Sequence, residues 1–558
     1  MPEEWGNSER RLTCVVDWRA NQTLAPVFAI GFRSFTQPLR RRFPSQSGDE
    51  VDEQSGGTFP QTLIDAFRAA PDLPAFEYEG RTVTRGEVLG AVAAFVRGLR
   101  GAGLTAGSHV ALDTGVSPEA FAVRIAAHAV GCTVIGLRPG LPREHLRSIL
   151  ARDVAAVITD DTNNAGLSSA ADALGVPLLD AAALRPREAP LSDFGDLTAQ
   201  GSPDDIGIIH LTSGSTGRPK GTTVTYAALS LNWAFGPACW NDRVRRLAAR
   251  YERFLLFGTL NSAVVFEHLG LCLMGGGTAV IPGQPLRFPE VFAQHRVTAC
   301  LVTVPRLYAI LDAAREGGAD LSSLRSLLVA GSPLPPHRLT DAAALLGPVV
   351  HHGYGQTETG MLSVLEPEEL AGDPGLADSV GRPLETVETV VRDSEGRDVP
   401  TGDAGEVWVR RPDFFCGYWG DAQETADVLR DGWVRTRDLG SLDADGYLRL
   451  AGRIRDIVIV NAIVHYAGPI ERALASHPDI DQAYVVSVPD EHSGEAIHAF
   501  VVPLPGAAAP AEETLRELVA RELGTASVPA GVGFLTEVPV ALSGKPDKAA
   551  LRAMVPPR

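Results

Sequence analysis

Cysteine is scarce in this sequence of 558 residues and follows no pattern. There is no C-x-x-C pair and no metal-ligand spacing, so we expect buried, reduced thiols and no structural zinc. His351 and His352 are adjacent but lack a third ligand at a useful spacing, which also argues against zinc. The six cysteines are Cys14, Cys132, Cys239, Cys272, Cys300 and Cys416.

Positive charge and long apolar runs are also in short supply. Lysine and arginine number 50 against 68 acidic residues, and the formal charge of -18 argues against a nucleic-acid partner. No apolar run approaches the ~18 residues that a membrane helix needs. The chain begins with Glu3 and Glu4 rather than with a basic region leading into an apolar one. We therefore expect a cytoplasmic protein without membrane insertion.

The chain is too long for one core and suits two or more domains, with an apolar content of 45% that is typical of soluble globular proteins. From Pro60 onward, helical patterns alternate with short apolar runs at 109–113, 154–159 and 298–304. Thr84 and Glu87 form a capping-box signature before one such helix. This rhythm predicts an α/β fold with parallel-rich sheets that helices cover on both faces.

After Gly381 the pattern changes to short alternating segments with turns, which predicts a small antiparallel or barrel subdomain. Near Asp456 a strand, helix, strand, strand, helix pattern predicts a small α+β domain. The tail before the first domain is a regulatory arm, a disordered segment or the result of a start codon assigned too early. The predicted units are a tail (1–58), a large domain (59–380), a barrel-like subdomain (381–455) and a mobile C-terminal domain (456–558).

The most informative stretch is LTSGSTGRPKG at 211–221, which follows an apolar strand pattern at 206–211. Its glycines allow successive N–H groups to face one anion, its hydroxyls add donors, and its lysine adds a point charge. Such runs are usually flexible linkers, but the position at the end of a core strand favours a phosphate-binding loop. Its candidate residues are Thr212, Ser213, Gly214, Ser215, Thr216, Gly217 and Lys220.

Six further motifs accompany this loop. Together they resemble, in order and at plausible distances, the motifs of the adenylate-forming superfamily of acyl-CoA synthetases, nonribosomal peptide adenylation domains and firefly luciferase. The resemblance covers roughly residues 60 to 552. The motifs are AGSP (330–333), YGQTE (354–358), GEVWVRRPDFFCGYW (405–419), GWVRTRDLGSLDADGYL (432–448), GRIRD (452–456) and SGKPDKAAL (543–551).

The resemblance implies a reaction in which a carboxylate attacks the α-phosphorus of ATP. Lys545 resembles the family's catalytic lysine, Thr357 a donor to the α-phosphate and Glu358 a ligand of Mg²⁺. Asp456 resembles the hinge about which the C-terminal domain turns. The residues that resemble the nucleotide-binding set are Gly331, Ser332, Pro333, Tyr354, Asp438 and Arg453.

Three departures from the family pattern limit what the resemblance implies. Arg437 replaces a glycine, and a positive φ there would cost it roughly 1–2 kcal/mol unless it contributes a phosphate or substrate contact. Asn261 stands where an aromatic residue commonly gates the acid pocket, to which we also assign His352 and Gly353. Asn461 and Ala462 replace a Gly-Gly pair that lines the family's thiol tunnel, and their side chains should narrow it.

These motifs predict an ATP- and Mg²⁺-dependent ligase that forms an adenylate and pyrophosphate, with a biosynthetic role in secondary metabolism. The predicted acceptor is the thiol of CoA or of the phosphopantetheine on an acyl carrier protein. One alternative keeps the adenylation but uses a non-thiol acceptor, either in amide formation or in nitrite activation for diazotisation of an amine. Another is a non-catalytic nucleotide-binding relative, against which the intact Lys545 and Glu358 argue.

Overall fold

The chain divides into two units, residues 1–55 and residues 56–558, and the description below concerns only the second. Nearly all of the predicted tail, Cys14 included, lies outside the described residues. The computed structural model describes residues 57–185, 197–212, 220–317, 320–412, 415–454, 456–460, 463–490, 493–541 and 545–555.

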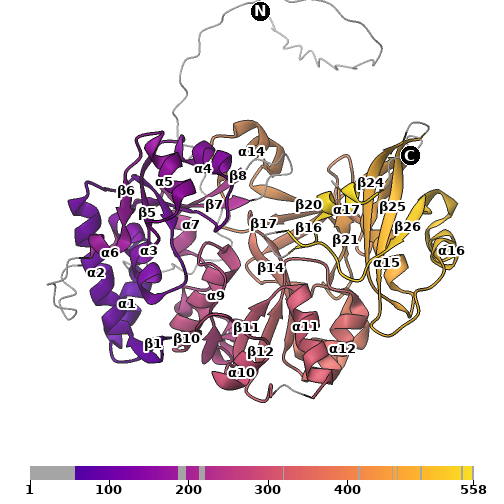
Figure 1. Cartoon of the computed structure of the whole chain (residues 1–558), viewed down its shortest axis with the longest axis horizontal. Coiled ribbons are helices and arrows are strands. Elements are labelled where there is room, and N and C mark those ends of the chain that lie inside the picture. The colour runs from indigo at the N-terminus through magenta and orange to yellow at the C-terminus, as the bar shows by residue number, and fades with distance from the viewer. Residues whose placement is uncertain are drawn as a thin grey trace, which may run out of the picture. The chain divides into compact units, whose positions relative to one another are not determined.

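Seven strands form the first sheet, which is shown in indigo and violet in Figure 1 except for β18, the strand that comes last in the sequence. The run from β7 through β4 and β3 to β5 and β6 is parallel, and β8 and β18 extend it antiparallel. In spatial order the strands are β18 (Gly417–Tyr418), β8 (Lys220–Thr225), β7 (Ile206–Thr212), β4 (Thr133–Gly136), β3 (His109–Asp113), β5 (Val154–Thr159) and β6 (Leu178–Asp180).

Nine strands form the second sheet, whose centre is parallel and whose two ends are antiparallel. In spatial order they are β15 (Arg382–Pro383), β14 (Gly360–Leu365), β13 (Val350–Gln356), β12 (Ser326–Val329), β11 (Ala299–Val302), β9 (Arg253–Leu255), β10 (Thr278–Ile281), β1 (Pro74–Tyr78) and β2 (Arg81–Thr84). The parallel-rich α/β fold predicted from the sequence is confirmed.

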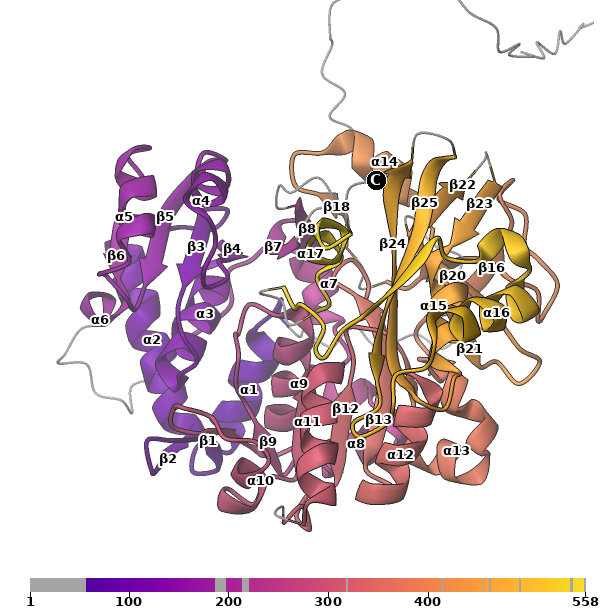
Figure 2. The ribbon, with the colours of Figure 1, turned by 45° about the vertical axis from the view of Figure 1, so that its right-hand side comes forward.

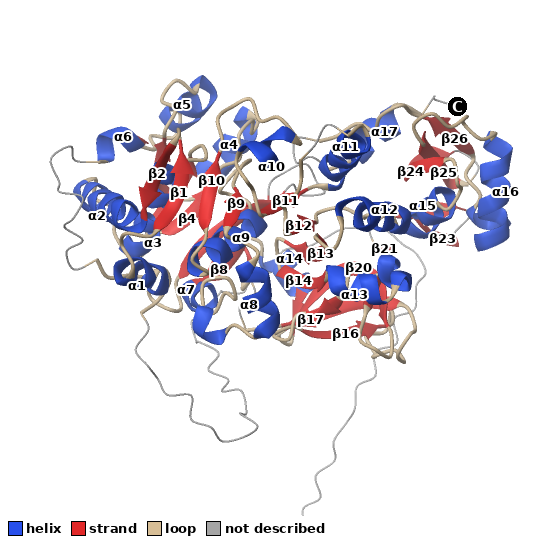
Figure 3. Cartoon of the chain, turned by 90° about the horizontal axis from the view of Figure 1, so that it is seen from below, coloured by secondary structure: helices blue, strands red, loops and turns tan. Residues whose placement is uncertain are grey.

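Helices flank these strands, as the blue and red colouring of Figure 3 makes clear. Phe95 in α2, Phe121 in α3 and Leu269 in α9 belong to one apolar core that strands of both sheets share. The predicted capping box is present, since Thr84 Oγ1 accepts from Glu87 N–H and Glu87 accepts from Thr84 N–H.

The helices accompanying the two large sheets vary from four to seventeen residues in length. They are α1 (Gln61–Ala69), α2 (Arg85–Gly101), α3 (Pro118–Val130), α4 (Arg143–Leu150), α5 (Ala165–Asp172), α6 (Ala181–Leu184), α7 (Tyr226–Ser230), α8 (Asp242–Ala249), α9 (Ala263–Met274), α10 (Glu290–Gln294), α11 (Val304–Arg315), α12 (Pro336–Leu346) and α13 (Pro367–Gly372).

A third, antiparallel sheet follows in the chain, as the change of pattern after Gly381 predicts. Helix α14 (Ala422–Val428) lies between two of its segments and precedes the strand that carries Arg437 and Asp438. The strands are β16 (Glu388–Arg392), β17 (Gly405–Arg410), β20 (Trp433–Leu442) and β19 (Leu429–Arg430), with β21 (Leu448–Arg453) paired to β20.

The C-terminal segment has its own sheet and core, and Figure 2 shows its strands together with α15 and α16 in yellow and orange. Ile470, Leu474 and Val485 are fully buried members of that core. The elements are β22 (Ile457–Val460), β23 (Ile463–Tyr466), α15 (Ala467–Ala475), β24 (Ile480–Asp490), β25 (Gly494–Pro503), α16 (Glu512–Leu523), β26 (Gly531–Phe534) and α17 (Lys548–Ala553).

The expectation of buried thiols is only partly correct. Cys132, Cys272 and Cys300 are buried, but Cys239 and Cys416 are exposed. Both exposed cysteines lie outside the strand and helix interiors that the apolar pattern marks: Cys239 closes a short 3-10 turn and Cys416 precedes β18. In the described part of the chain, no helix is long and apolar enough to cross a membrane.

Candidate active site

The predicted phosphate loop joins β7 to β8, and its two ends are held together in the sheet because Thr212 pairs with Lys220. The Lys220 ammonium lies 2.8 Å from a carboxylate oxygen of Glu424 in α14 and 5.5 Å from the centre of the Tyr418 ring. The rest of the loop, Ser213, Gly214, Ser215, Thr216 and Gly217, lies outside the described residues.

Asp438 lies at the centre of a hydrogen-bonded group. Its carboxylate accepts from the Tyr354 hydroxyl at 2.6 Å, from the Gln356 amide at 2.6 Å and from Arg453 Nε at 3.0 Å. Burial, together with the charge of Asp438, raises the pKa of Tyr354, so the phenol remains a donor. Asp438 and Tyr354 are nearly inaccessible to solvent, which fixes the direction of the carboxylate.

Lys545 comes from the far end of the chain and reaches the same region. Its Cε lies 3.8 Å from the position that a Cβ on Gly331 would take, and Gly331 has a φ of +95° that favours glycine. Burial lowers the pKa of Lys545, as do the positive charges of Arg453 and Arg138, while Glu358 and Asp438 oppose them.

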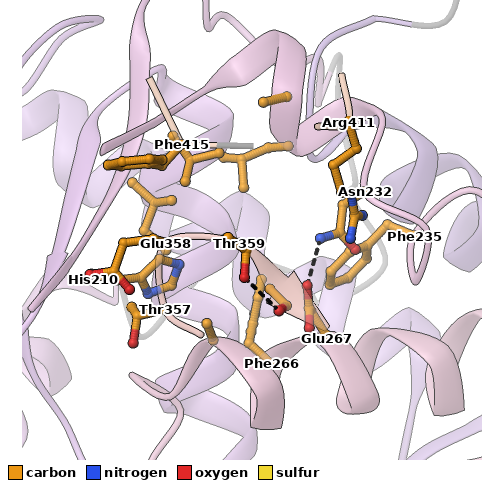
Figure 4. A pocket seen from close by; sticks show the side chains of 16 residues that line it. His210, Asn232, Phe235, Phe266, Glu267, Thr357, Glu358, Thr359, Arg411 and Phe415 are labelled. Carbon is orange, nitrogen blue, oxygen red and sulfur yellow. Dashed lines mark hydrogen bonds between the residues drawn. The ribbon is translucent and has the colours of Figure 1, made fainter. Parts of the chain in front are cut away.

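A pocket lies beside Thr357 and Glu358, which form one side of it in Figure 4. Side chains from β7, β8, α7, α9 and the turn after α7, together with Arg411 and Phe415, form the rest of the wall. Its aromatic members are Phe235, Phe266 and Phe415. A flat apolar body with a polar end would match this mixed lining.

Three polar side chains of the cavity, Asn232, Glu267 and Arg411, lie on the side away from Glu358 in Figure 4. Glu267 in α9 is buried, and one of its oxygens accepts a hydrogen bond of 3.2 Å from the Asn232 amide. A Cβ on Gly360 would lie only 2.9 Å from that oxygen, so the glycine leaves room for the carboxylate. Arg411 is also buried and donates to the Met361 carbonyl at 3.0 Å. Glu267 is not among the residues predicted from the sequence, although a lone acid within the apolar pattern of α9 is a signal for it.

Glu358 offers one carboxylate to a metal ion. Its Oε1 accepts a hydrogen bond of 2.9 Å from the Tyr418 hydroxyl, and the residue is partly exposed to the cavity. Elsewhere in the described chain, no group of three His, Cys, Asp or Glu residues could hold a metal. A single carboxylate fits Mg²⁺, because that ion is commonly bound by one or two carboxylates and by substrate phosphates.

The residues assigned to the acid pocket from the sequence are Asn261, His352 and Gly353. Asn261 is buried beside the first sheet, where it accepts from Arg124 at 2.9 Å and donates to the Leu137 carbonyl at 2.6 Å. His352 and Gly353 lie in β13, and His352 Nδ1 is hydrogen-bonded to the carbonyl oxygen of Ser379 at 3.2 Å. None of the three is among the residues that line the cavity at Glu358.

Asp456, the predicted hinge, lies just before β22 and contacts Lys548 at 2.9 Å. Lys548 also contacts Glu471 at 3.0 Å, so the hinge carboxylate is tied to α15 through one lysine. Burial opposes the charge on Lys548, but the two carboxylates prevail and raise its pKa. Asn461 and Ala462, at the predicted thiol tunnel, lie outside the described residues.

Arg437 has a φ of +59°, so the conformation anticipated for the replaced glycine is present and an arginine adopts it. Its guanidinium lies 2.7 Å from the same Glu424 oxygen that Lys220 contacts. Two cations from distant strands thus share one carboxylate next to the predicted phosphate loop.

Family models match most of the described chain. The model described as AMP-binding enzyme matches residues 64–419, and the AMP-binding enzyme C-terminal domain matches residues 469–545. Feruloyl-CoA synthase from Amycolatopsis sp is 34% identical over 89% of this chain and 99% of its own length. Indoleacetate--CoA ligase from Aromatoleum aromaticum is 30% identical over 87% of this chain and 96% of its own length.

Solved structures agree with these sequence matches. The amide bond synthetase McbA from Marinactinospora thermotolerans is 33% identical, with a TM-score of 0.77 over 88% of this chain and 98% of that protein. ATP-bound MatB from Rhodopseudomonas palustris is 23% identical, with a TM-score of 0.75 over 88% of this chain and 98% of that protein. At that identity the match supports the fold alone.

Proposed function

This chain belongs to the AMP-binding enzyme family and is an adenylate-forming ligase, and we propose that it activates a carboxylic acid and transfers it to a thiol of CoA or of a carrier protein. Lys545 lies beside Gly331, and the charges of Glu358 and Asp438 oppose the lowering of its pKa. This arrangement, beside a pocket lined by aromatic and polar side chains, supports the proposal.

In the first step, a carboxylate oxygen of the acid attacks the α-phosphorus of ATP, and the bond from that phosphorus to the pyrophosphate oxygen breaks. Two anions must come into contact, so the Lys545 ammonium opposes their repulsion and stabilises the charge that develops. Thr357, at the cavity wall, is suited to donate a hydrogen bond to the α-phosphate.

The remaining nucleotide contacts follow from the same geometry. Asp438 offers its carboxylate to the ribose hydroxyls, and Arg453 keeps it oriented. Tyr354, with Gly331, Ser332 and Pro333, is assigned to adenine. Glu358 would hold Mg²⁺, which supplies positive charge to the phosphates when bound.

In the second step, the acceptor sulfur attacks the acyl carbon, AMP leaves with the oxygen that joined it to the acid, and the thiol proton passes to solvent. Residues 456–558 would turn about Asp456 between the two steps, as a separate domain with its own core. We retain the proposed boundaries of a large domain at 59–380 and a barrel-like subdomain at 381–455. A cytoplasmic location also remains a proposal.

The lining of the cavity narrows the acid. Phe235, Phe266 and Phe415 offer flat apolar contact, while Glu267 and Asn232 offer polar contact at the end opposite Glu358. We therefore propose an aromatic acid with a hydrogen-bond donor distant from its carboxylate. The names of two relatives, feruloyl-CoA synthase and indoleacetate--CoA ligase, agree with an aromatic acid.

A second candidate acceptor is an amine, which the match to the amide bond synthetase McbA supports. In that case the amine nitrogen attacks the acyl carbon, loses a proton and displaces AMP. Activation of nitrite in place of a carboxylic acid is a further variant, since the buried Arg411 offers positive charge at the cavity wall.

Isotope exchange between pyrophosphate and ATP tests the first step across a panel of benzoic, cinnamic and indole acids, with nitrite included. We expect exchange with at least one aromatic acid and none with a Lys545→Ala variant. If neither nitrite nor any acid of the panel supports exchange faster than that of the Lys545→Ala variant, the ligase proposal fails. Consumption of CoA, carrier-protein thiol or amine then identifies the acceptor.

A further inference from the structure

Arg437 has a backbone conformation that disfavours it. A residue with a Cβ at a φ of +59° costs roughly 1–2 kcal/mol relative to the right-handed region, yet the chain places its longest cationic side chain there. Strained backbone of this kind persists where the surrounding contacts over-determine it, and it clusters at functional sites. The contacts that hold Arg437 are therefore informative.

The guanidinium of Arg437 and the ammonium of Lys220 meet at one atom. Oε1 of Glu424 lies 2.7 Å from Arg437 Nη1 and 2.8 Å from Lys220 Nζ. All three side chains are at most 20% exposed, so water screens these contacts weakly. Burial raises the pKa of Glu424, but hydrogen bonds from Lys220 and Arg437 lower it to about 2, and the carboxylate is ionised at neutral pH.

This cluster adjoins the predicted phosphate and metal sites. The Tyr418 ring lies 5.5 Å from the Lys220 ammonium, and the Tyr418 hydroxyl bonds to Glu358 at 2.9 Å. On the other side, Arg437 directly precedes Asp438 in β20. A triphosphate that extends from Asp438 toward the loop between β7 and β8 would bring its terminal phosphates to the two cations that Glu424 now occupies.

We propose that Arg437 is a second cation for the β- and γ-phosphates of ATP, and that Glu424 is an internal anion that the phosphates displace and that returns as pyrophosphate leaves. This inference rests on the proposed function, because it assumes a triphosphate at Lys220. A phosphate group carries more charge than a carboxylate and matches the planar fork of arginine, so it competes well for both cations. Glu424 offsets part of the positive charge of the two cations between turnovers and limits product retention.

The competing explanation is a structural ion pair that only holds α14 against β20. The two explanations predict different directions for the change in ligand affinity of the variants. If the pair is structural, removing either partner disturbs the same contact and should weaken ligand binding in both variants. If Glu424 competes with phosphate, its neutralisation should tighten binding, whereas loss of the Arg437 charge should weaken it.

The test is direct binding of inorganic pyrophosphate and of ATP to the full chain, by calorimetry, without acid or acceptor. We expect Glu424→Gln to bind pyrophosphate about tenfold more tightly than the parent chain, and Arg437→Met about tenfold more weakly. Arg437→Lys, which keeps the charge, should recover part of the loss. Glu406→Gln is the matched control. Glu406 pairs at 2.9 Å with Arg435, which lies in β20 as Arg437 does, and this substitution should leave pyrophosphate binding unchanged.

Shifts of the same sign in Glu424→Gln and Arg437→Met, or no shift in either, would overturn the inference. Thermal unfolding of each variant, without ligand, separates a folding defect from a change in binding. Because binding is measured without an acid, this result is independent of the exchange assay. If the ligase proposal is wrong, acid-dependent exchange will be absent. If only this inference is wrong, exchange will be present, but Glu424→Gln and Arg437→Met will not change pyrophosphate affinity in opposite directions.

Discussion

Asp481 gives the most demanding test of how the C-terminal segment is held in the arrangement described here. Its carboxylate in β24 accepts from Arg338 Nε in α12, and the two side chains are 5% and 2% exposed. Arg338 also lies over the Tyr308 ring, 4.5 Å from its centre, and Gln482 donates to Asp481 at 3.0 Å. This buried pair joins the large domain to the segment that carries Lys545.

Replacing Asp481 with alanine leaves the Arg338 guanidinium buried without its carboxylate, a change that costs about 3–5 kcal/mol in buried pairs. The protein can avoid that cost by letting the C-terminal segment leave α12, so that water reaches Arg338. Lys545 then leaves the site as well. Since about 3 kcal/mol is more than a hundredfold in an equilibrium constant, we expect pyrophosphate exchange to fall roughly a hundredfold at saturating ATP.

The assay combines this exchange rate with hydrogen exchange of the amides in α12. We expect faster amide exchange in α12 for Asp481→Ala and unchanged protection of the first sheet. The matched control is the double variant Arg338→Leu with Asp481→Leu, which removes both charges and should restore most of the activity. An Asp481→Ala protein with parental exchange rates in both measurements would refute the reasoning.

Three further results are expected. Burial raises the pKa of Asp481, but hydrogen bonds from His337, Arg338 and Gln482 outweigh that effect and lower it. Its contribution to stability should therefore be present above its unfolded pKa of 3.8 and should be lost as pH falls through the lower folded value, as urea unfolding at several pH values would reveal. Because burial, Arg453 and Arg138 lower the pKa of Lys545, the exchange rate should decline with rising pH at a value below 10.5. A decline only above 10.5 would contradict the lowered pKa, and a rate that does not decline would contradict the ammonium role. Glu267→Gln should lower the preference for hydroxylated over unsubstituted cinnamic acid about fivefold in kcat/KM, whereas an unchanged ratio would remove Glu267 from acid recognition.

The sequence predicted the fold class and the family well, because both depend on local patterns. The apolar runs at 109–113 and 154–159 are β3 and β5, and the Thr84 capping box begins α2. The change to an antiparallel sheet after Gly381 is also confirmed. These features require only the spacing of residues along one segment.

The cavity could not be predicted in the same way. Asn232, Glu267 and Arg411 come from separate segments and meet only in the folded chain. Asn261, chosen by its position relative to a family motif, bonds to Arg124 inside the protein. Alignment to a motif gives a place along the chain, but the direction of a side chain depends on the packing around it.

The central claim is that the acid itself attacks the α-phosphorus of ATP, and oxygen transfer tests it most directly. An acid that supports exchange is prepared with ¹⁸O in both carboxylate positions and is turned over with the acceptor that it uses. The account predicts that each AMP carries a single ¹⁸O atom from the acid, as mass spectrometry would show. AMP without the label, formed at the same rate as the acyl product, would contradict the account.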